Sequence, residues 1–139
     1  MPTVSKVFVD TDVFVALRDT KDSTHRRAVS LYKELKLKKT KFLTSSDVIG
    51  ETITVLAKKL GKQSALDFLR TINGLTQEIF IDAFLHKESR NLFKRIKSKN
   101  ISFIDCSSAV AMKRNKIKSI FSFDRDFKKM GVKLTADVF

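Results

Sequence analysis

The sequence is poor in the residues that stabilise small proteins by means other than a packed core. It has one cysteine, one proline, four glycines and no tryptophan. With Cys106 alone, neither an internal disulfide framework nor a cysteine-rich zinc site is expected. No apolar run approaches the roughly 20 residues of a membrane span, and the N-terminus lacks the apolar region of a signal peptide. We therefore expect a cytoplasmic protein without a membrane partner.

Linkers and repeats are also lacking. No segment is rich in proline, glycine or serine, and no internal repeat is visible. Hydrophobic residues make up 42% of the 139 positions, and twelve phenylalanines supply most of the aromatic volume. A chain of this length and composition can bury a substantial core. The sequence therefore predicts a single domain over residues 1–139.

What the chain does have is positive charge. Lys and Arg total 28 against 15 Asp and Glu, which gives a formal net charge of +13. Such an excess keeps some proteins soluble, and in others it attracts the phosphate backbone of a nucleic acid. Charge alone does not separate these two interpretations, so the arrangement of the acidic residues has to decide between them.

Short apolar runs alternate with amphipathic stretches along the chain. The predicted strands are residues 6–10, 41–44, 77–81, 100–104, 118–123 and 132–135. The predicted helices are residues 13–18, 23–37, 46–60, 62–72 (ended by Asn73-Gly74), 83–98 and 106–114, with a helical turn at 127–130. This alternation is typical of an α/β fold with a central, mostly parallel sheet flanked by helices. In such sheets, functional sites form beyond the carboxyl ends of the strands.

Four acidic residues stand beside apolar segments of the chain. Asp10, Asp105 and Asp124 each follow an apolar run that is predicted to be a strand. Because the carboxyl ends of parallel strands meet at one edge of the sheet, we expect these three residues to lie close together. Glu51 lies at the margin of the apolar face of helix 46–60, from which it can point toward the same edge.

Carboxylates gathered at one edge would repel one another. Two unit charges 4 Å apart cost roughly 4 kcal/mol at an effective dielectric near 20, so protons or a divalent cation must offset the repulsion. Oxygen ligands combined with water suit Mg²⁺ or Mn²⁺. Zinc is not expected, because the chain has only two histidines and one cysteine. Each acid taken alone also fits a structural role, as a helix cap, a turn residue or a solvated helix residue.

Several stretches match one nuclease family in order and spacing. They are residues 7–14 (Val-Phe-Val-Asp-Thr-Asp-Val-Phe), Glu51 in helix 46–60, Phe103-Ile104-Asp105, and residues 121–127 (Phe-Ser-Phe-Asp-Arg-Asp-Phe). In these stretches the chain resembles the PIN domain family, and within it the VapC-type toxin ribonucleases. The resemblance implies a PIN-like three-layer fold and a metal-dependent endoribonuclease that hydrolyses RNA phosphodiester bonds. It assigns the catalytic and metal-binding roles to Asp10, Glu51, Asp105 and Asp124.

The resemblance also implies a cofactor and partners. The cofactor is Mg²⁺ (or Mn²⁺), the substrate is RNA, and the partners are a cognate antitoxin protein and a second copy of the chain in a homodimer. The apolar segment Ala65–Leu75 fits either a protein interface or the core. The RNA sequence that is cleaved does not follow from the resemblance, because phosphate contacts carry no sequence information.

Four polar residues close to the acids in sequence are candidates for supporting positions around the metal. Thr11 and Ser122 can hydrogen-bond its ligands, although a hydrogen bond to the backbone is an equal alternative. Asp126 follows the family pattern and is expected to point away or to support the site. Asp12 stands where the family more often has Ser or Asn. It fits a supporting acid, a fifth ligand or a helix N-cap, and we favour the cap.

Four basic residues are the first candidates for RNA contact, because they lie close in sequence to Asp105 and Asp124. They are Lys113, Arg114, Lys116 and Lys118. A solvated helix face is the alternative interpretation of such a group.

Three other functions stay open at this point. A solitary PIN-type RNA-processing nuclease would use the same chemistry without an antitoxin. A haloacid-dehalogenase-type phosphatase would use Asp10 as nucleophile and Asp12 as general acid, but this scheme leaves Glu51 without a role. A non-catalytic RNA-binding module would keep the acidic pocket only for binding.

Overall fold

The computed structural model describes residues 5–139, within which five strands form one sheet. The strands are β1 (Lys6–Val9), β2 (Lys41–Ser45), β3 (Gln77–Ile79), β4 (Ser119–Phe121) and β5 (Lys133–Leu134). Their order across the sheet is β3-β2-β1-β4-β5, and each neighbouring pair is parallel. The α/β class and the parallel sheet that the sequence predicts are confirmed.

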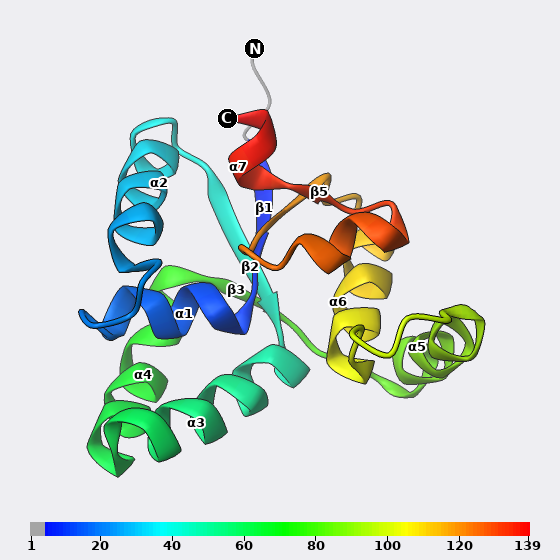
Figure 1. Cartoon of the computed structure of the whole chain (residues 1–139), viewed down its shortest axis with the longest axis horizontal. Helices are drawn as coiled ribbons and strands as arrows, with labels where there is room; N and C mark the ends of the chain where they lie inside the picture. Colours follow the sequence, from blue (N-terminus) through cyan, green and yellow to red (C-terminus); the bar gives the residue numbers. More distant parts are fainter. Residues whose placement is uncertain (1–4) are drawn as a thin grey trace.

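Helices cover both faces of this sheet and give the fold three layers. They are α1 (Thr11–Arg18), α2 (His25–Leu37), α3 (Ser46–Leu60), α4 (Lys62–Leu75), α5 (Ala83–Arg95), α6 (Phe103–Arg114), the 3-10 helix η1 (Arg125–Met130) and α7 (Thr135–Val138). Figure 1 shows α1 and α2 on one side of the sheet and α6 with α5 on the other. Helix α3 contacts both α1 and α6, so it joins the two helical layers. No helix in the described part of the chain is long and apolar enough to cross a membrane.

The central strand β1 forms the middle of the core. Val7, Phe8 and Val9 are all buried, because helices cover both faces of the sheet. Phe8 lies opposite Leu43 on β2 and Ile120 on β4 in the strand register. A strand held on both sides and both faces is rigid, so the residue that follows it has a fixed position.

One predicted strand is wrong. Residues 100–104 do not pair with the sheet, and Phe103 is already the first residue of α6. Ser102 is the N-cap of this helix: its Oγ accepts a hydrogen bond from the Asp105 backbone N–H at 3.1 Å, and Asp105 Oδ2 accepts one from the Ser102 N–H at 2.9 Å. This reciprocal capping box starts the helix. A short apolar run looks the same in a strand and in a buried helix end, which is why the sequence pattern misled.

Helix α4 also departs from the predicted bounds. It runs to Leu75, through the Asn73-Gly74 pair that was expected to end it. A glycine inside a helix costs about 1 kcal/mol relative to alanine. Here the buried side chain of Ile72 packs in the core, and the Thr76 N–H donates to the Ile72 carbonyl. These contacts hold the last turn in helical form and place Leu75 on the surface.

Candidate active site

The carboxyl ends of β1 and β4 bring the first two acids together. Asp10 follows β1, and Asp124 comes shortly after the end of β4 at Phe121. The Asp10 backbone N–H donates to the Phe121 carbonyl at 3.1 Å, which fixes the two strand ends side by side. The sequence therefore predicted the position of this pair for the correct reason.

The other two acids reach the same edge from helices. Asp105 lies in the first turn of α6, where the capping box with Ser102 holds it, and it is half-buried. Glu51 lies in α3 and is also half-buried. With Asp10 and Asp124 they line one cleft of about 540 Å³. The structure thus brings all four predicted residues to one place, although Asp105 does not follow a strand.

Burial and mutual repulsion perturb the acids of this cleft. Asp10 is only 6% exposed, and its burial raises the pKa of its carboxyl well above the usual value. The negative charges of Asp12 and Asp105 raise that pKa further. Burial also raises the pKa of Asp105, with added contributions from the charges of Asp124 and Glu51. The acids therefore form one electrostatic cluster in which the ionised state is costly.

Ser122 connects two of these carboxylates. Its Oγ lies 3.1 Å from Asp10 Oδ2 and 3.3 Å from Asp12 Oδ2, and it accepts a hydrogen bond from the Asp124 N–H at 3.1 Å. One hydroxyl has a single proton, so it donates to one of the two carboxylates at a time. Ser122 is itself buried. It therefore orients the acidic side chains, which is one of the two roles that the sequence left open.

Asp12 does not act as the helix cap that we favoured. Asp10 occupies the N-cap position of α1, and Asp12 lies inside the first turn. Asp12 Oδ2 accepts a hydrogen bond from the Phe123 backbone N–H at 2.8 Å, which ties α1 to the segment that follows β4. Burial raises the pKa of Asp12 to about 6, although the hydrogen bond from Phe123 acts in the opposite direction. Asp12 also lines the cleft, so it belongs to the acidic cluster.

Thr11 and Asp126 have structural contacts. Thr11 Oγ1 lies 3.2 Å from Thr52 Oγ1 and 3.5 Å from the Val48 carbonyl oxygen, so it joins α1 to α3. The carboxylate of Asp126 pairs with Lys129 at 2.8 Å, while its backbone N–H donates to Asp124 Oδ1 at 2.9 Å. The Asp126 side chain thus points away, and its backbone holds Asp124.

One lysine that lies in the cleft was not predicted from the sequence. Among the described residues that line the cleft, Lys59 is the only lysine or arginine. Its Nζ lies 3.5 Å from Asp19 Oδ2 and 3.6 Å from Asp22 Oδ2, so it ties the end of α3 to the loop between α1 and α2. These positions are distant in sequence, and only the folded chain brings them together.

The basic residues predicted for RNA contact lie elsewhere. Lys116 and Lys118 precede β4 and line a hollow with Lys6, at the amino ends of the strands. Lys113 and Arg114 are in the last turn of α6, whereas Asp105 is in its first turn. A helix of this length extends about 18 Å from end to end. Closeness in sequence therefore does not bring these cations to the cleft, and their contact with RNA stays a prediction.

The donor atoms of the cleft fit Mg²⁺ or Mn²⁺ better than a metal that prefers nitrogen or sulfur. The titratable groups there are carboxylates apart from Lys59, and one oxygen of Asp12, Oδ1, is buried without a hydrogen-bond partner among the described residues. Within residues 5–139, no three acidic, histidine or cysteine side chains are positioned as a ready-made ligand group. Mg²⁺ keeps several of its waters when it binds a protein, so carboxylates that do not form such a group can still supply its ligands.

The fold and the cleft define an α/β protein whose acidic site lies at the carboxyl edge of a parallel sheet. Residues 7–133 match the family profile of the PIN domain, and the chain belongs to the PIN domain family. This confirms the family that the sequence resembles. It also sets aside the haloacid-dehalogenase-type phosphatase, in which Asp10 would be the nucleophile and Asp12 the general acid.

The chain is also similar to two named proteins. The chain is 28% identical over 126 residues to the 23S rRNA-specific endonuclease VapC20 of Mycobacterium tuberculosis, from strains CDC 1551 / Oshkosh and H37Rv, which covers 90% of this chain and 94% of the relative. The crystal structure of M. tuberculosis VapC20, described as a Sarcin-Ricin loop cleaving toxin, superposes with a TM-score of 0.82 at 27% identity and covers 91% of this chain and 95% of that one. VapBC2 from Rickettsia felis, bound to a DNA fragment from its promoter, has a TM-score of 0.65 at 19% identity, with 93% and 96% covered, and shows the shared fold alone.

Proposed function

We propose that this chain is a VapC-type endoribonuclease that requires Mg²⁺ or Mn²⁺ and acts as the toxin of a toxin–antitoxin pair. The observation that carries the proposal is the cleft in which Asp10, Glu51, Asp105 and Asp124 lie together, and in which burial and neighbouring charges raise the pKa values of Asp10 and Asp105. The similarity to a 23S rRNA-specific endonuclease over 90% of the chain supports RNA as the substrate. It also makes the sarcin–ricin loop of 23S rRNA the first substrate to test.

The chain's own residues hold the acids in position for this reaction. Bound Mg²⁺ or Mn²⁺ would supply an activated water and stabilise negative charge on the scissile phosphate. Ser122 orients Asp10, the capping box orients Asp105, and the Asp126 backbone N–H orients Asp124. We assign the metal-binding role to these three acids together with Glu51. The two histidines do not line the cleft and Cys106 is buried, so neither a histidine nor a cysteine is assigned as nucleophile.

The reaction is tested by incubating a 23S rRNA fragment that contains the sarcin–ricin loop with the purified protein. Wild type is compared with Asp105→Asn, each with Mg²⁺, with Mn²⁺ and with EDTA. Glu34→Gln is the matched control, because it also neutralises one carboxylate but lies on the surface of α2, where Glu34 pairs with Lys38. We expect cleavage by wild type and Glu34→Gln with metal, and none with EDTA or by Asp105→Asn. Equal cleavage in every lane would refute the proposal.

The same assay separates a nuclease from a non-catalytic RNA-binding module. A binding module would retain the RNA on the protein, but it would release no shorter product with either metal. Metal-dependent product that Asp10→Asn abolishes excludes that alternative. Binding without product, under conditions in which RNA affinity is measurable, would favour it.

Toxin status and its partners form a separate part of the proposal. Helix α4 has two faces: Phe68 and Ile72 are in the core, while Leu66, Leu69 and Leu75 are 36%, 41% and 41% exposed. Exposed leucines on one helix are consistent with a protein interface, for the antitoxin or for a second copy. We expect induced expression to arrest growth, the Asp10→Asn variant to be harmless, and light scattering to show a dimer. Harmless wild-type expression and a monomeric mass would favour a solitary RNA-processing nuclease.

A further inference from the structure

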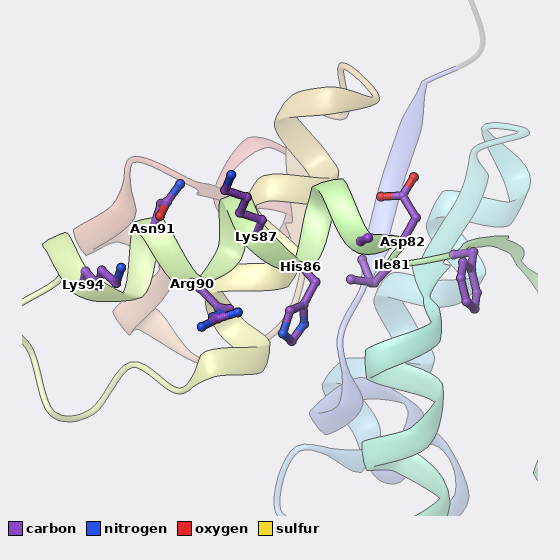
Figure 2. A pocket seen from close by; sticks show the side chains of 9 residues that line it. Ile81, Asp82, His86, Lys87, Arg90, Asn91 and Lys94 are labelled. Carbon is purple, nitrogen blue, oxygen red and sulfur yellow. The ribbon is translucent and has the colours of Figure 1, made fainter.

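A shallow hollow lies beside α5, outside the acidic cleft. Its volume is about 710 Å³, and its wall includes Phe80, His86, Lys87, Arg90 and Lys94. Figure 2 shows its labelled side chains in succession along the helix, from Asp82 at its start to Lys94 near its end. We call the set of five residues Phe80, His86, Lys87, Arg90 and Lys94 the α5 basic face.

The cations of this face are free to bind a ligand. Lys87, Arg90 and Lys94 are exposed, and none of them forms an ion pair with an acidic side chain within residues 5–139. Asp82 is the one carboxylate among the described residues that line the hollow, and its Oδ1 accepts a hydrogen bond from the Leu85 N–H at 2.9 Å to cap α5. Arg90 and Lys94 are four positions apart, so they lie on one side of the helix. The hollow therefore has an excess of positive charge, with three cations against one carboxylate.

Phe80 adds an aromatic ring to these cations. It is 71% exposed, more than any other phenylalanine recorded as exposed in the described part of the chain. The loop that carries it is not free, because the Ile81 N–H donates to Ser46 Oγ at 2.8 Å and ties it to the start of α3. An exposed ring on an anchored loop, beside unpaired cations, is the combination with which proteins bind single-stranded nucleic acids, through base stacking and phosphate contacts.

The α5 basic face adjoins the acidic cleft. His86 packs against Phe103, with ring centroids 5.2 Å apart. Phe103 is the first residue of α6. The residue before it, Ser102, lines the cleft, and Asp105 lies in the first turn of the same helix. On the other side, Ser46 opens α3, the helix that carries Glu51. The end of the hollow that holds Ile81 and His86 thus touches the helices that supply the two helix-borne acids.

We propose that the α5 basic face binds the RNA strand next to the cleavage point, a proposal that rests on the ribonuclease function proposed above. Lys87, Arg90 and Lys94 contact phosphates, and Phe80 stacks on a base. A second copy of the chain is a poorer occupant of this surface. If the α5 basic faces of two copies met, their positive charges would repel each other. The acidic cleft alone repels a phosphate backbone, so a neighbouring basic surface is needed to hold the strand.

The test measures RNA affinity separately from cleavage. In an Asp10→Asn background, which prevents cleavage, Arg90→Glu/Lys94→Glu is titrated against a fluorescent 23S rRNA fragment containing the sarcin–ricin loop, over a series of salt concentrations. The matched control is Lys6→Glu/Lys41→Glu, which also reverses two exposed charges but lies at the amino ends of β1 and β2. We expect affinity to fall about tenfold or more, and the slope of log K against log salt to decrease by about 1.4 to 1.8. We expect the control to change affinity by less than about threefold, since exposed distant charges are screened.

Two further variants make the result specific. Phe80→Ala is expected to weaken binding about tenfold without changing the salt slope, because stacking is not an ionic contact. Arg90→Gln/Lys94→Gln is expected to weaken binding in the same direction as the charge reversal, with a smaller change. Thermal melts of all variants are compared, and the exposed positions of Arg90 and Lys94 predict unchanged stability.

Each outcome decides one question. If Arg90→Glu/Lys94→Glu binds RNA no more weakly than the control, the binding face is refuted, whether or not wild type cleaves RNA. If wild type does not cleave but RNA affinity depends on Arg90 and Lys94, the ribonuclease function fails and the binding face stands. If these variants change the mass measured by light scattering and leave RNA affinity unchanged, the surface is a protein interface and the proposal is overturned.

Discussion

Charges of opposite sign lie at the two edges of the sheet, the carboxyl edge and the amino edge, where the strands end and begin. Their repulsion lowers the free energy of unfolding to very different extents at the two edges. At the carboxyl edge, Asp10 and Asp124 meet Glu51 and Asp105 in a cleft, and Asp10 is almost fully buried. At the amino edge, Lys6 on β1 lies directly opposite Lys41 on β2, and both are exposed. Lys116, Lys118 and Lys133 lie at the same edge. Like charges are thus neighbours at both edges.

The environment of the charges separates the two edges. Water and salt screen exposed lysines, so their repulsion contributes little to the free energy of unfolding. Buried carboxylates lose hydration and repel one another strongly. For this reason, burial and neighbouring charges raise the pKa values of Asp10 and Asp105. Only the acidic edge is therefore expected to reduce the stability of the folded protein appreciably. A destabilising cluster of this kind is expected to serve a function. Changes at that edge should therefore have large effects, and changes at the amino edge small ones.

The largest effect is expected from Asp10→Asn. Loss of this carboxylate should lower the kcat/KM for RNA cleavage about a thousandfold, because electrostatic stabilisation at the reacting phosphate is lost. The same variant should raise the Tm of the metal-free protein by about 3 °C, because it removes a buried charge from the repelling cluster. Cleavage kinetics and calorimetry measure the two quantities. A variant that keeps its activity or melts at a lower temperature would contradict the functional interpretation of the cluster.

A slightly smaller effect is expected from pH. Burial raises the pKa of Asp12 from 3.8 to about 6, so the folded protein holds this proton more tightly than the unfolded chain does. The contribution of Asp12 to the free energy of unfolding is therefore greatest at low pH and falls by about 3 kcal/mol as pH rises from about 4 to about 6. Asp10 and Asp105 act in the same direction, and Asp22, whose pKa is lowered by hydrogen bonds from Thr24, acts against them.

The pH effect is measured by urea unfolding of the metal-free protein across this range, with EDTA present. Asp12→Asn should flatten the profile, because the amide does not titrate and retains an oxygen for the Phe123 N–H. A free energy of unfolding that rises from pH 4 to pH 6 in the wild-type protein would contradict the prediction.

A divalent cation should offset the cost of the acidic edge. At pH 7, free Mg²⁺ at about thirty times its Kd should stabilise the protein by about 2 kcal/mol. Asp105→Asn and Asp124→Asn should reduce this stabilisation, because each removes one ligand, whereas Lys118→Glu at the other edge should leave it unchanged. Thermal melts with and without Mg²⁺ measure the difference. Equal stabilisation of Asp105→Asn and wild type would place the cation elsewhere.

The sequence predicted the position of the site better than it predicted the elements around it. Strands β1 and β4 are buried on both faces and read as continuous apolar runs, so their ends, and with them Asp10 and Asp124, could be placed. The run before Asp105 was interpreted as a strand and is the start of a helix. Asp105 still lies at the same edge, because the N-termini of helices α3 and α6 lie where the strands end. The acid was placed correctly for a wrong reason.

Contacts between distant segments could not be predicted from the sequence. Lys59 meets Asp19 and Asp22, and Ser122 meets Asp12, only because folding brings α1, α3 and the end of β4 together. The same limit explains the choice of basic residues. Distance along the chain suggested the cations beside Asp105 and Asp124, whereas α6 and β4 carry those cations to the far edge of the sheet.

The smallest effect is expected from Lys116→Glu/Lys118→Glu, which tests that choice directly. Both lysines are exposed at the amino edge, where they line a hollow with Lys6 and Lys133. Their distance from the cleft leaves only long-range attraction to RNA, which salt screens within about 8 Å at physiological ionic strength. We therefore expect kcat/KM to fall by less than about threefold at 150 mM salt, with a larger decrease only at low salt. A tenfold loss at 150 mM salt would show that RNA contacts this edge, and the contrast between the two edges would then no longer separate function from solubility.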